Sequence, residues 1–310
     1  MELDVEYTNK TFTNMNFVSR PGLQTFNSTS TNSMTLSSES FERWRQFIYK
    51  SCGIYFQDNK KYLLESRLLK RLNSLKLNSY EEYFDYVNLG SRKTIEMQEL
   101  YEAITINETY FFRNQPQQEA LIQKIIPELI QAKYNTPFKK IKIWSAASSS
   151  GEEAYSIAMV IKEYIQPRFP QFSFEIVGTD ISKEMLEKAR GGVYNDYAIK
   201  NLPLNFLKKN FTKTPRGFEI TSDIKKYASF IELNLYDDLK MRSMQNFDVV
   251  ICANVLIYFD LKSKIKVVNH LYNALNKGGY LFIGYSETLH GISQAFKLTS
   301  FPKTIGYKKE

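Results

Sequence analysis

The chain has 310 residues, and 43% of them are apolar, which is enough for one large or two moderate domains with cores of their own. A formal charge of +8 favours an acidic partner, which could be nucleic acid, an anionic membrane or an acidic protein surface. The only cysteines, Cys52 and Cys252, argue against a disulfide framework or a cysteine-rich metal site, so we expect a reducing compartment and no bound metal.

Residues 1–38 are rich in threonine, asparagine and serine and show no regular apolar period, which predicts a mostly disordered tail. The N-terminus is acidic and lacks a basic-then-apolar pattern, so no secretory signal is expected. The longest apolar run, from Val249 to Phe259, is too short to span a bilayer. We therefore expect a cytoplasmic protein without membrane insertion.

Apolar residues recur at helical spacing through the next part of the chain. This pattern predicts four helices over residues 40–53, 58–76, 80–89 and 94–104. On the second of these, a stripe of basic residues lies beside the apolar face, at Lys60, Arg67, Lys70 and Arg71. A solvated helix face is the ordinary interpretation of such a stripe. Residues 39–117 are thus predicted to form an all-helical domain.

After Pro127 the pattern alternates between strands and helices. Strands are expected over 140–144, 174–180, 247–257 and 280–285, and helices over 152–164, 182–190 and 262–275. A turn is expected at Gly278-Gly279, a terminal hairpin over 296–307, and an inserted small β-subdomain at about 204–230. The alternation predicts an α/β domain over 118–310, with a doubly wound sheet of mostly parallel strands.

The first two strands of this domain end at a predicted ligand crevice. Asp180 ends the second strand, where a carboxylate suits the two hydroxyl groups of a ribose. Glu152 and Glu153 follow a loop with one glycine, Gly151, and would repel the pyrophosphate of a nicotinamide cofactor. They favour the cationic S-adenosylmethionine over a dehydrogenase cofactor, although acids in a first helical turn also simply complement the helix dipole.

Four motifs then resemble those of one family. Thr105 to Arg113 is similar to the Thr-x-Asn-Glu-Thr-x-Phe-Phe-Arg signature of the chemotaxis receptor methyltransferases, CheR. Ile143 to Ser156 resembles their Trp-Ser-Ala-x-x-Ser-x-Gly-Glu-Glu-x-Tyr-Ser loop. Asn254 to Asp260 and Gly284 to Glu287 match the later motifs. The resemblance covers about residues 40–308, with the motifs in the family's order.

The resemblance implies an N-terminal helical domain, a Rossmann-like methyltransferase domain and an inserted β-subdomain. It implies methyl esterification of glutamate side chains on chemoreceptors, with S-adenosylmethionine as donor and S-adenosylhomocysteine as product. The implied partner is the cytoplasmic helical domain of those receptors. The protein itself would be a monomer associated with receptor arrays. The basic stripe would be the receptor-docking surface, and no nucleic acid partner is expected.

The resemblance also implies roles for individual residues. The donor site would be formed by Asn107, Thr109, Arg113, Glu153, Asp180, Asn234, Leu235, Ala253 and Asn254, with Asn234 and Leu235 flanking the adenine. The catalytic residues would be Arg113, holding the acceptor carboxylate, and Tyr258, facing the reacting methyl group. The alternatives to these catalytic roles are structural: a salt bridge for Arg113 and a place in the aromatic core for Tyr258.

The sequence departs from the family at two positions and in one subdomain. Ala253 stands where the family usually has arginine, and Tyr285 stands where it usually has histidine. The inserted subdomain looks short for gripping a receptor's C-terminal peptide, as it does in some members. The Ala253 departure and the atypical tail motivate one alternative, a donor-binding regulatory module with weak or no catalysis. The positive charge motivates another, a methyltransferase that acts on RNA.

Overall fold

The computed structural model describes residues 34–90 and 93–310. The predicted disordered tail, 1–38, lies outside the described residues except for its last five. There the chain is already ordered by two contacts: the Leu36 side chain is buried, and the Ser37 hydroxyl caps the first helix by accepting from the Ser40 N–H. Structure therefore begins slightly earlier than the composition predicts.

In the described residues of the N-terminal part, four helices form, as the apolar spacing predicts. They are α1 (Ser38–Cys52), α2 (Lys61–Leu75, preceded by the short turn η1, Asp58–Lys60), α3 (Tyr80–Leu89) and α4 (Lys93–Ile104). Trp44 of α1 lies at the centre of their core, with its ring centroid 5.0 Å from that of Tyr83. Gly53 ends α1 in the left-handed conformation (φ 77°), which glycine adopts without a steric penalty.

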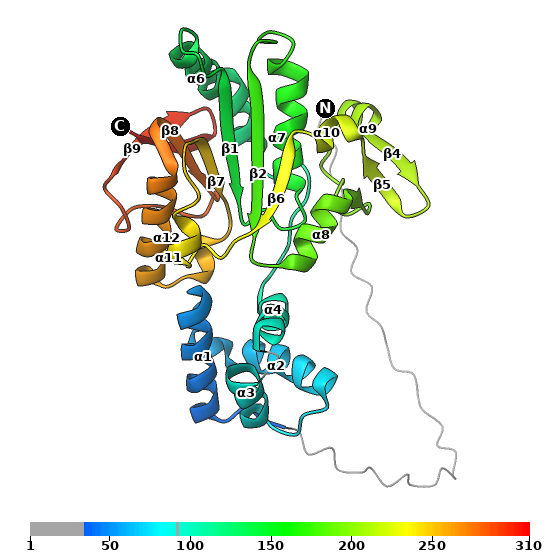
Figure 1. Cartoon of the computed structure of the whole chain (residues 1–310), viewed down its shortest axis with the longest axis vertical. Coiled ribbons are helices and arrows are strands. Elements are labelled where there is room, and N and C mark those ends of the chain that lie inside the picture. The colour runs from blue at the N-terminus through cyan, green and yellow to red at the C-terminus, as the bar shows by residue number, and fades with distance from the viewer. Residues whose placement is uncertain (1–33, 91–92) are drawn as a thin grey trace, which may run out of the picture. The chain divides into compact units, whose positions relative to one another are not determined.

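The C-terminal part is built around a seven-stranded sheet (Figure 1). Its order is β6 (Ala228–Glu232), β2 (Ser173–Asp180), β1 (Lys140–Ala146), β7 (Phe247–Cys252), β8 (Leu275–Ile283), β10 (Thr304–Lys309) and β9 (Phe296–Phe301). The first five are parallel, and the predicted C-terminal hairpin adds two antiparallel strands at one edge. The predicted doubly wound α/β sheet is confirmed.

Helices cover both faces of the sheet because its central strands are apolar on both faces. Val249 and Ile251 of β7 belong to one core cluster, while Val250 and Cys252 belong to the other. The first cluster is covered by α5 (Gln115–Ala120), η2 (Leu121–Ile125), α6 (Ile126–Lys133), α7 (Glu152–Val160), η3 (Ile161–Ile165) and α8 (Lys183–Gly191). The second is covered by α11 (Asp238–Met241) and α12 (Leu261–Ala274).

Two expectations for the central strands are wrong in detail. The strand expected over 247–257 ends at Cys252, and the chain continues as a loop into the short turn η4 (Leu256–Tyr258). Gly278-Gly279 does not turn the chain, because β8 already begins at Leu275 and passes through the glycines with a register shift against β7. Gly278 adopts φ 80°, so the bulge itself requires glycine.

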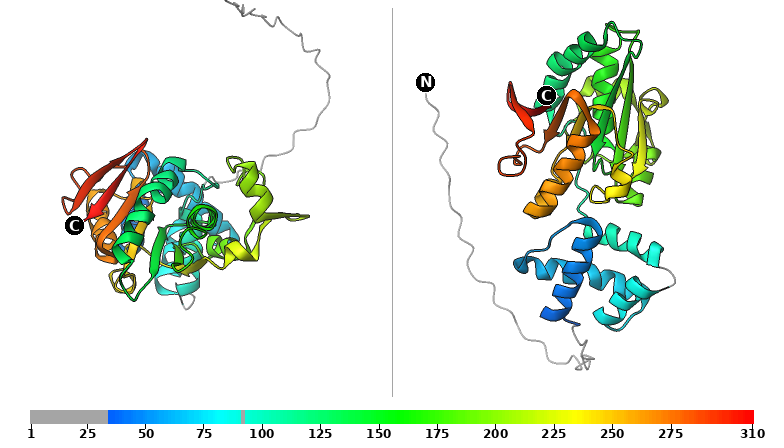
Figure 2. Two further views of the ribbon diagram at one scale, coloured as in Figure 1. Left: turned by 90° about the horizontal axis from the view of Figure 1, so that it is seen from above. Right: turned by 60° about the vertical axis from the view of Figure 1, so that its left-hand side comes forward.

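The inserted subdomain lies earlier in the chain than the expected 204–230. It consists of β3 (Val193–Tyr194), α9 (Leu204–Asn210), β4 (Phe211–Thr214) and β5 (Gly217–Ile220), and α10 (Ser222–Lys225) leads out of it. Residues 228–232 are instead the edge strand β6 of the main sheet, where the Phe230 ring fills the space beside the bare Cα of Gly178. In both views of Figure 2 the small sheet lies apart from the C-terminal hairpin.

The helical part ends before the predicted boundary at residue 117. The helix α4 stops at Ile104, and the following segment packs on the α/β part, with the N–H of Phe111 donating to the Ala198 carbonyl. Residues 35–310 form a single compact unit. Within the residues that the structure describes, no helix is long and apolar enough to cross a membrane.

Candidate donor and acceptor site

A cavity of about 320 Å³ lies at the carboxyl ends of the strands, where the strand order reverses between β1 and β7. Its wall comes from the end of α1, the segment 104–118, the loop after β1, the ends of β2 and β6, and the loop after β7. Every residue predicted for donor binding or catalysis lines it: Asn107, Thr109, Arg113, Glu153, Asp180, Asn234, Leu235, Ala253, Asn254 and Tyr258.

Asp180 ends β2 inside this cavity and is almost fully buried. Its Oδ2 accepts from the Ser149 N–H at 2.8 Å, and its Oδ1 accepts from the Ser182 N–H at 2.9 Å. These two bonds fix the plane of the carboxylate and still leave each oxygen able to accept a further hydrogen bond. Burial raises the pKa of Asp180 to about 6, against the opposing effect of the two N–H groups.

The two glutamates at the start of α7 have different surroundings. Glu153 lines the cavity and accepts from the Ser145 hydroxyl at 2.7 Å, and burial raises its pKa to about 7. Glu152 is buried outside the cavity, where the Ser150 hydroxyl donates to it. Of the two glutamates, only Glu153 is therefore placed to contact a cationic ligand. Glu152 instead complements the dipole at the helix N-terminus, which was the alternative interpretation for both acids.

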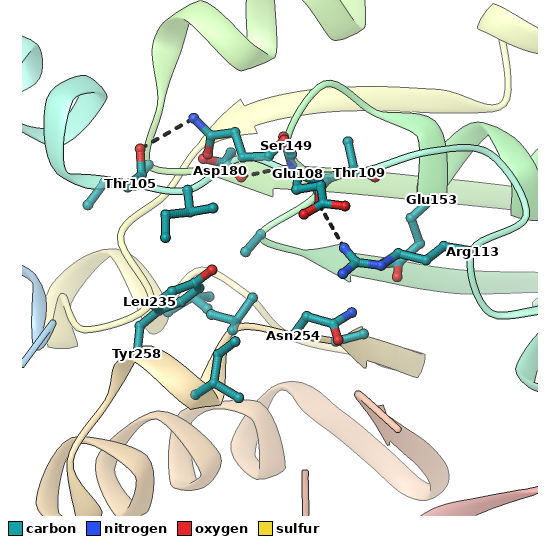
Figure 3. Close-up of a pocket in the computed structure, with 18 of the residues that line it drawn as sticks. Thr105, Glu108, Thr109, Arg113, Ser149, Glu153, Asp180, Leu235, Asn254 and Tyr258 are labelled. Carbon is teal, nitrogen blue, oxygen red and sulfur yellow. Dashed lines mark hydrogen bonds between the residues drawn. The ribbon is translucent and has the colours of Figure 1, made fainter. Parts of the chain in front are cut away.

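The segment 105–113 lies along one wall of the cavity. The Asn107 carbonyl accepts from the Ser149 hydroxyl at 3.1 Å, which ties this segment to the loop after β1. Arg113 is exposed, and its Nη1 donates to the Glu108 carbonyl at 2.7 Å, as Figure 3 shows. That bond fixes one end of the guanidinium, whose planar group carries five N–H donors in all.

The loop after β7 forms the opposite wall, with Tyr258 and Asn254 across the cavity from Thr109 and Asp180 (Figure 3). Asn254 adopts the left-handed conformation at φ 62°, which asparagine tolerates better than most residues. Partial burial raises the pKa of the Tyr258 hydroxyl, and the charges of Arg113 and Arg67 oppose this rise. Tyr258 is thus a half-buried phenol under the electrostatic influence of two arginines, and not a core aromatic.

Asn234 lines the cavity, but its side chain is already engaged. Its Nδ2 donates to the Ser51 carbonyl at 2.8 Å, and its Oδ1 accepts from the Tyr236 N–H at 2.9 Å. Leu235, next to it, is buried and contributes an apolar wall. Asn234 therefore joins the end of α1 to this wall. It contributes to the shape of the binding site more than to hydrogen bonds with a ligand.

The basic residues of η1 and α2 do not form one free surface. Arg71 forms a two-bond pair with the nearly buried Glu96, at 3.0 and 2.9 Å, and a further ion pair with Glu99. Arg67 is partly buried and donates to the Ile104 carbonyl, within electrostatic range of Tyr258. Lys60 and Lys70 are exposed. The four basic residues thus differ in their availability, because α4 supplies the two glutamates that pair with Arg71, and helical spacing alone does not reveal such a neighbour.

Three further residues of the cavity wall were missed by the sequence reasoning. Ser149 supplies the N–H that orients Asp180. The Ser148 hydroxyl and the Gln118 side-chain oxygen are buried, and neither has a hydrogen-bond partner within the part of the chain that the structure describes. Ser148 and Ser149 belong to the loop of small residues after β1, and the sequence pattern indicated that loop as a whole as part of the ligand crevice. No sequence pattern indicated Gln118. Buried polar atoms of this kind are usually satisfied by a ligand or water.

Comparison with known families agrees with the motifs. Residues 107–305 match the family described as CheR methyltransferase, SAM binding domain. Residues 39–105 match the family described as CheR methyltransferase, all-alpha domain. The junction between the two matches falls where α4 ends and the cavity-lining segment begins.

Several chemotaxis methyltransferases resemble the chain over most of its length. Chemotaxis protein methyltransferase 2 of Vibrio cholerae is 35% identical over 279 residues, which cover 90% of this chain and 95% of that protein. The chemotaxis protein methyltransferase of Borreliella burgdorferi is 37% identical over 262 residues, covering 83% and 91%. The chemotaxis protein methyltransferase Cher2 of Pseudomonas putida is 35% identical over 279 residues, covering 89% and 99%.

Proposed function

The chain belongs to the CheR methyltransferase family, and from this premise we propose that it esterifies glutamate side chains of chemotaxis receptors with the methyl group of S-adenosylmethionine. The observation that carries the proposal is the cavity at the strand ends, where residues of three of the four motifs meet Asp180 and the segment 233–235. The product of the donor is S-adenosylhomocysteine.

The residues of the cavity fit this donor. Asp180 is held flat by two N–H groups and retains acceptor capacity for the ribose hydroxyls. Glu153 offers a carboxylate to a positively charged ligand, and Leu235 with Leu233 and Ile181 offers an apolar slot for a planar base. The unpartnered Ser148 hydroxyl and Gln118 oxygen add two polar groups that a ligand would satisfy. Asn107, Thr109, Ala253 and Asn254 complete the proposed donor site.

The bound donor supplies an electrophilic methyl group on a positively charged sulfur. The acceptor is a glutamate carboxylate with an ordinary pKa of about 4.3, so it is already a nucleophile at neutral pH and needs no general base. Arg113 holds this carboxylate through the guanidinium N–H groups that the Glu108 carbonyl does not use. Tyr258, on the opposite wall, orients the reacting groups through its hydroxyl.

Positioning is the main work that this chemistry leaves to the protein. Holding two reacting groups in line can lower a barrier by about 7–11 kcal/mol in favourable cases. The charges of donor and acceptor neutralise each other during transfer, so an enclosed site with little water favours the reaction. The end of α1 and the segment 104–113 contribute to this enclosure, because Cys52, Ile54 and Ile104 line the cavity together with the strand ends.

We propose that Lys60 and Lys70 attract the acidic helices of the receptor's cytoplasmic domain, with Arg67 acting nearer the cavity. Arg71 has mainly a structural role through Glu96. The protein would act as a monomer among receptor arrays in the cytoplasm.

The decisive experiment follows tritiated methyl groups from labelled donor into membranes that contain the source cell's receptors. The expected product releases methanol in base, because carboxyl esters hydrolyse where methylated nitrogen does not. Calorimetry with S-adenosylmethionine and S-adenosylhomocysteine measures donor binding separately. Donor binding without transfer to any receptor would favour the regulatory module, and no donor binding by folded protein would refute the proposal.

A further inference from the structure

The motif Gly284-Tyr-Ser-Glu287 follows β8 and contributes no residue to the cavity lining. It lies beside the loop that carries Asn254 and Tyr258, because β7 and β8 are neighbouring parallel strands and both chains leave the sheet at the same edge. Glu287 is partly buried and does not line the cavity. Its effect on the reaction therefore has to pass through its neighbours.

The carboxylate of Glu287 accepts hydrogen bonds from three backbone N–H groups. Its Oε2 accepts from the N–H of Asn254 at 2.9 Å and from that of Gly284 at 2.6 Å. Its Oε1 accepts from the N–H of Ile257 at 3.2 Å. One side chain thus joins the end of β8 to both ends of the turn that precedes Tyr258. Bonds to an ionised acceptor are about twice as strong as neutral ones.

The loop needs such an anchor because its backbone is not held by the sheet. The β7 ladder ends at Cys252, Asn254 adopts φ 62°, and η4 spans only three residues. Backbone N–H groups in such a turn need partners from outside it. Glu287 supplies them, so the loop is fixed without a longer helix or a further strand.

Gly284 is required by the same arrangement. A Cβ at this position would lie 2.6 Å from the Glu287 Oε2 and 2.8 Å from the Asn254 backbone nitrogen. Both separations are shorter than real Cβ contacts, and the Asn254 contact is with backbone. The glycine of the motif therefore provides the space that the glutamate carboxylate needs to reach the Asn254 backbone.

The helical part holds the loop from its other end. The N–H of Tyr55 donates to the Tyr258 carbonyl at 3.0 Å, and Ile54 forms a bridge with Phe259. The Tyr49 hydroxyl donates to the Asp260 carboxylate at 3.2 Å. The residues from Asn254 to Asp260 are thus anchored by Glu287 on one side and by the end of α1 on the other.

We propose that Glu287 is a positioning residue for methyl transfer, whose carboxylate sets the place of Tyr258 through the backbone N–H groups of Asn254 and Ile257. The inference rests on the proposed function. A carboxylate is needed because both of its oxygens accept. A glutamine could keep the Asn254 and Gly284 bonds with its oxygen, but its NH2 group would then face the Ile257 N–H.

This asymmetry makes Glu287→Gln a selective test. Donor affinity, measured by calorimetry, should change less than about threefold because the Asn254 bond survives. The turnover number for receptor methylation should fall on the order of 100-fold, as expected when a reacting group shifts by about 1 Å. A parallel loss of donor affinity and turnover would contradict a role that acts through Tyr258 alone.

Glu128→Gln is the matched control. Glu128 is also a partly buried carboxylate that accepts from Tyr280 and Lys308, and none of these three residues lines the cavity. Its loss should lower stability without lowering turnover at a temperature where both variants are folded. If both variants lose turnover equally, the effect is general destabilisation and the inference fails.

Two further measurements identify the route of the effect. Hydrogen exchange of the peptide over residues 253–258 should become faster in Glu287→Gln and stay unchanged in Glu128→Gln. In a Tyr258→Phe background, Glu287→Gln should cost clearly less turnover than in the wild type, because the two residues act on one step. Unchanged exchange, or fully additive losses, would overturn the inference.

The exchange measurement needs no receptor and no methyl transfer. If the wild type transfers no methyl group, the proposed function fails, and exchange alone still shows whether Glu287 holds the loop. If the wild type transfers methyl groups and the Glu287→Gln variant matches it, the proposed function stands and only this inference falls.

Discussion

The acids of the cavity and the bases of α2 are both charged groups that stand out in the sequence, but their surroundings differ. Glu153 and Asp180 lie in one cavity, where the Ser145 hydroxyl of β1 orients Glu153 and the Ser149 N–H of the following loop orients Asp180. Arg67 and Arg71 share a helix, but one donates to a backbone carbonyl near Tyr258 and the other pairs with Glu96. Strand ends bring charges together by topology, whereas helical spacing leaves open which neighbour covers the face.

Among the proposed substitutions, replacement of Arg71 has the largest expected effect. Arg71→Ala leaves the nearly buried Glu96 carboxylate without its cation, which should lower the free energy of unfolding by about 3 kcal/mol. Denaturant unfolding measures the loss. Lys70→Ala, at the exposed neighbouring position, should leave stability within about 0.5 kcal/mol. Equal stability of the two variants would refute the structural role of Arg71.

Arg113→Ala tests the acceptor side of the cavity. We expect receptor methylation to fall on the order of 100-fold, because the acceptor carboxylate loses its two-pronged anchor. Kinetics with saturating donor measure the loss, and Arg43→Ala, which breaks a surface ion pair with Asp85, serves as the control. Full receptor methylation by Arg113→Ala would refute its catalytic assignment.

Asp180→Asn tests the donor side. An amide retains only one acceptor oxygen where the carboxylate offers two, so the Ser149 and Ser182 N–H groups compete with the donor for it. Losing one bond to a charged acceptor should weaken donor binding about 10-fold. Calorimetry measures this affinity, and Asp223→Asn on the surface should leave it unchanged. Unaltered affinity in Asp180→Asn would place the ribose elsewhere.

The pH dependence of donor binding has the smallest expected effect. In the donor-free protein, burial raises the pKa of Glu153 to about 7 and that of Asp180 to about 6. A cationic donor favours the ionised forms, so affinity should rise several-fold between pH 5.5 and 8 with release of protons. Calorimetry in buffers of different ionisation enthalpy counts these protons. Affinity that is flat across this range would mean that neither acid faces the cation.

The same shifts set the sign of the stability change in the donor-free protein. Both folded pKa values lie above the ordinary values of 4.5 for glutamate and 3.8 for aspartate. The folded state therefore binds more protons than the unfolded state between about pH 4 and 7. The free energy of unfolding should fall as the pH rises through this window, and saturating donor should reduce the fall.

Much of the site could be predicted because its residues lie in local motifs. The strand that ends in Asp180 and the loop that leads to Glu153 were readable from alternation and turn chemistry. Gln118 and the engaged amide of Asn234 were not, since their surroundings depend on segments far away in the sequence. The small sheet was misplaced because the edge strand with Phe230 carries the same alternating pattern as a separate hairpin.

The sequence by itself determined the order of strands and helices, the acids at the strand ends and the family resemblance, because each depends on residues close together in the chain. The tertiary structure decided which charged groups face the cavity, which form internal pairs, and how Glu287 holds the Tyr258 loop. These outcomes depend on which distant backbone or side chain comes within hydrogen-bond distance, and no local pattern specifies that.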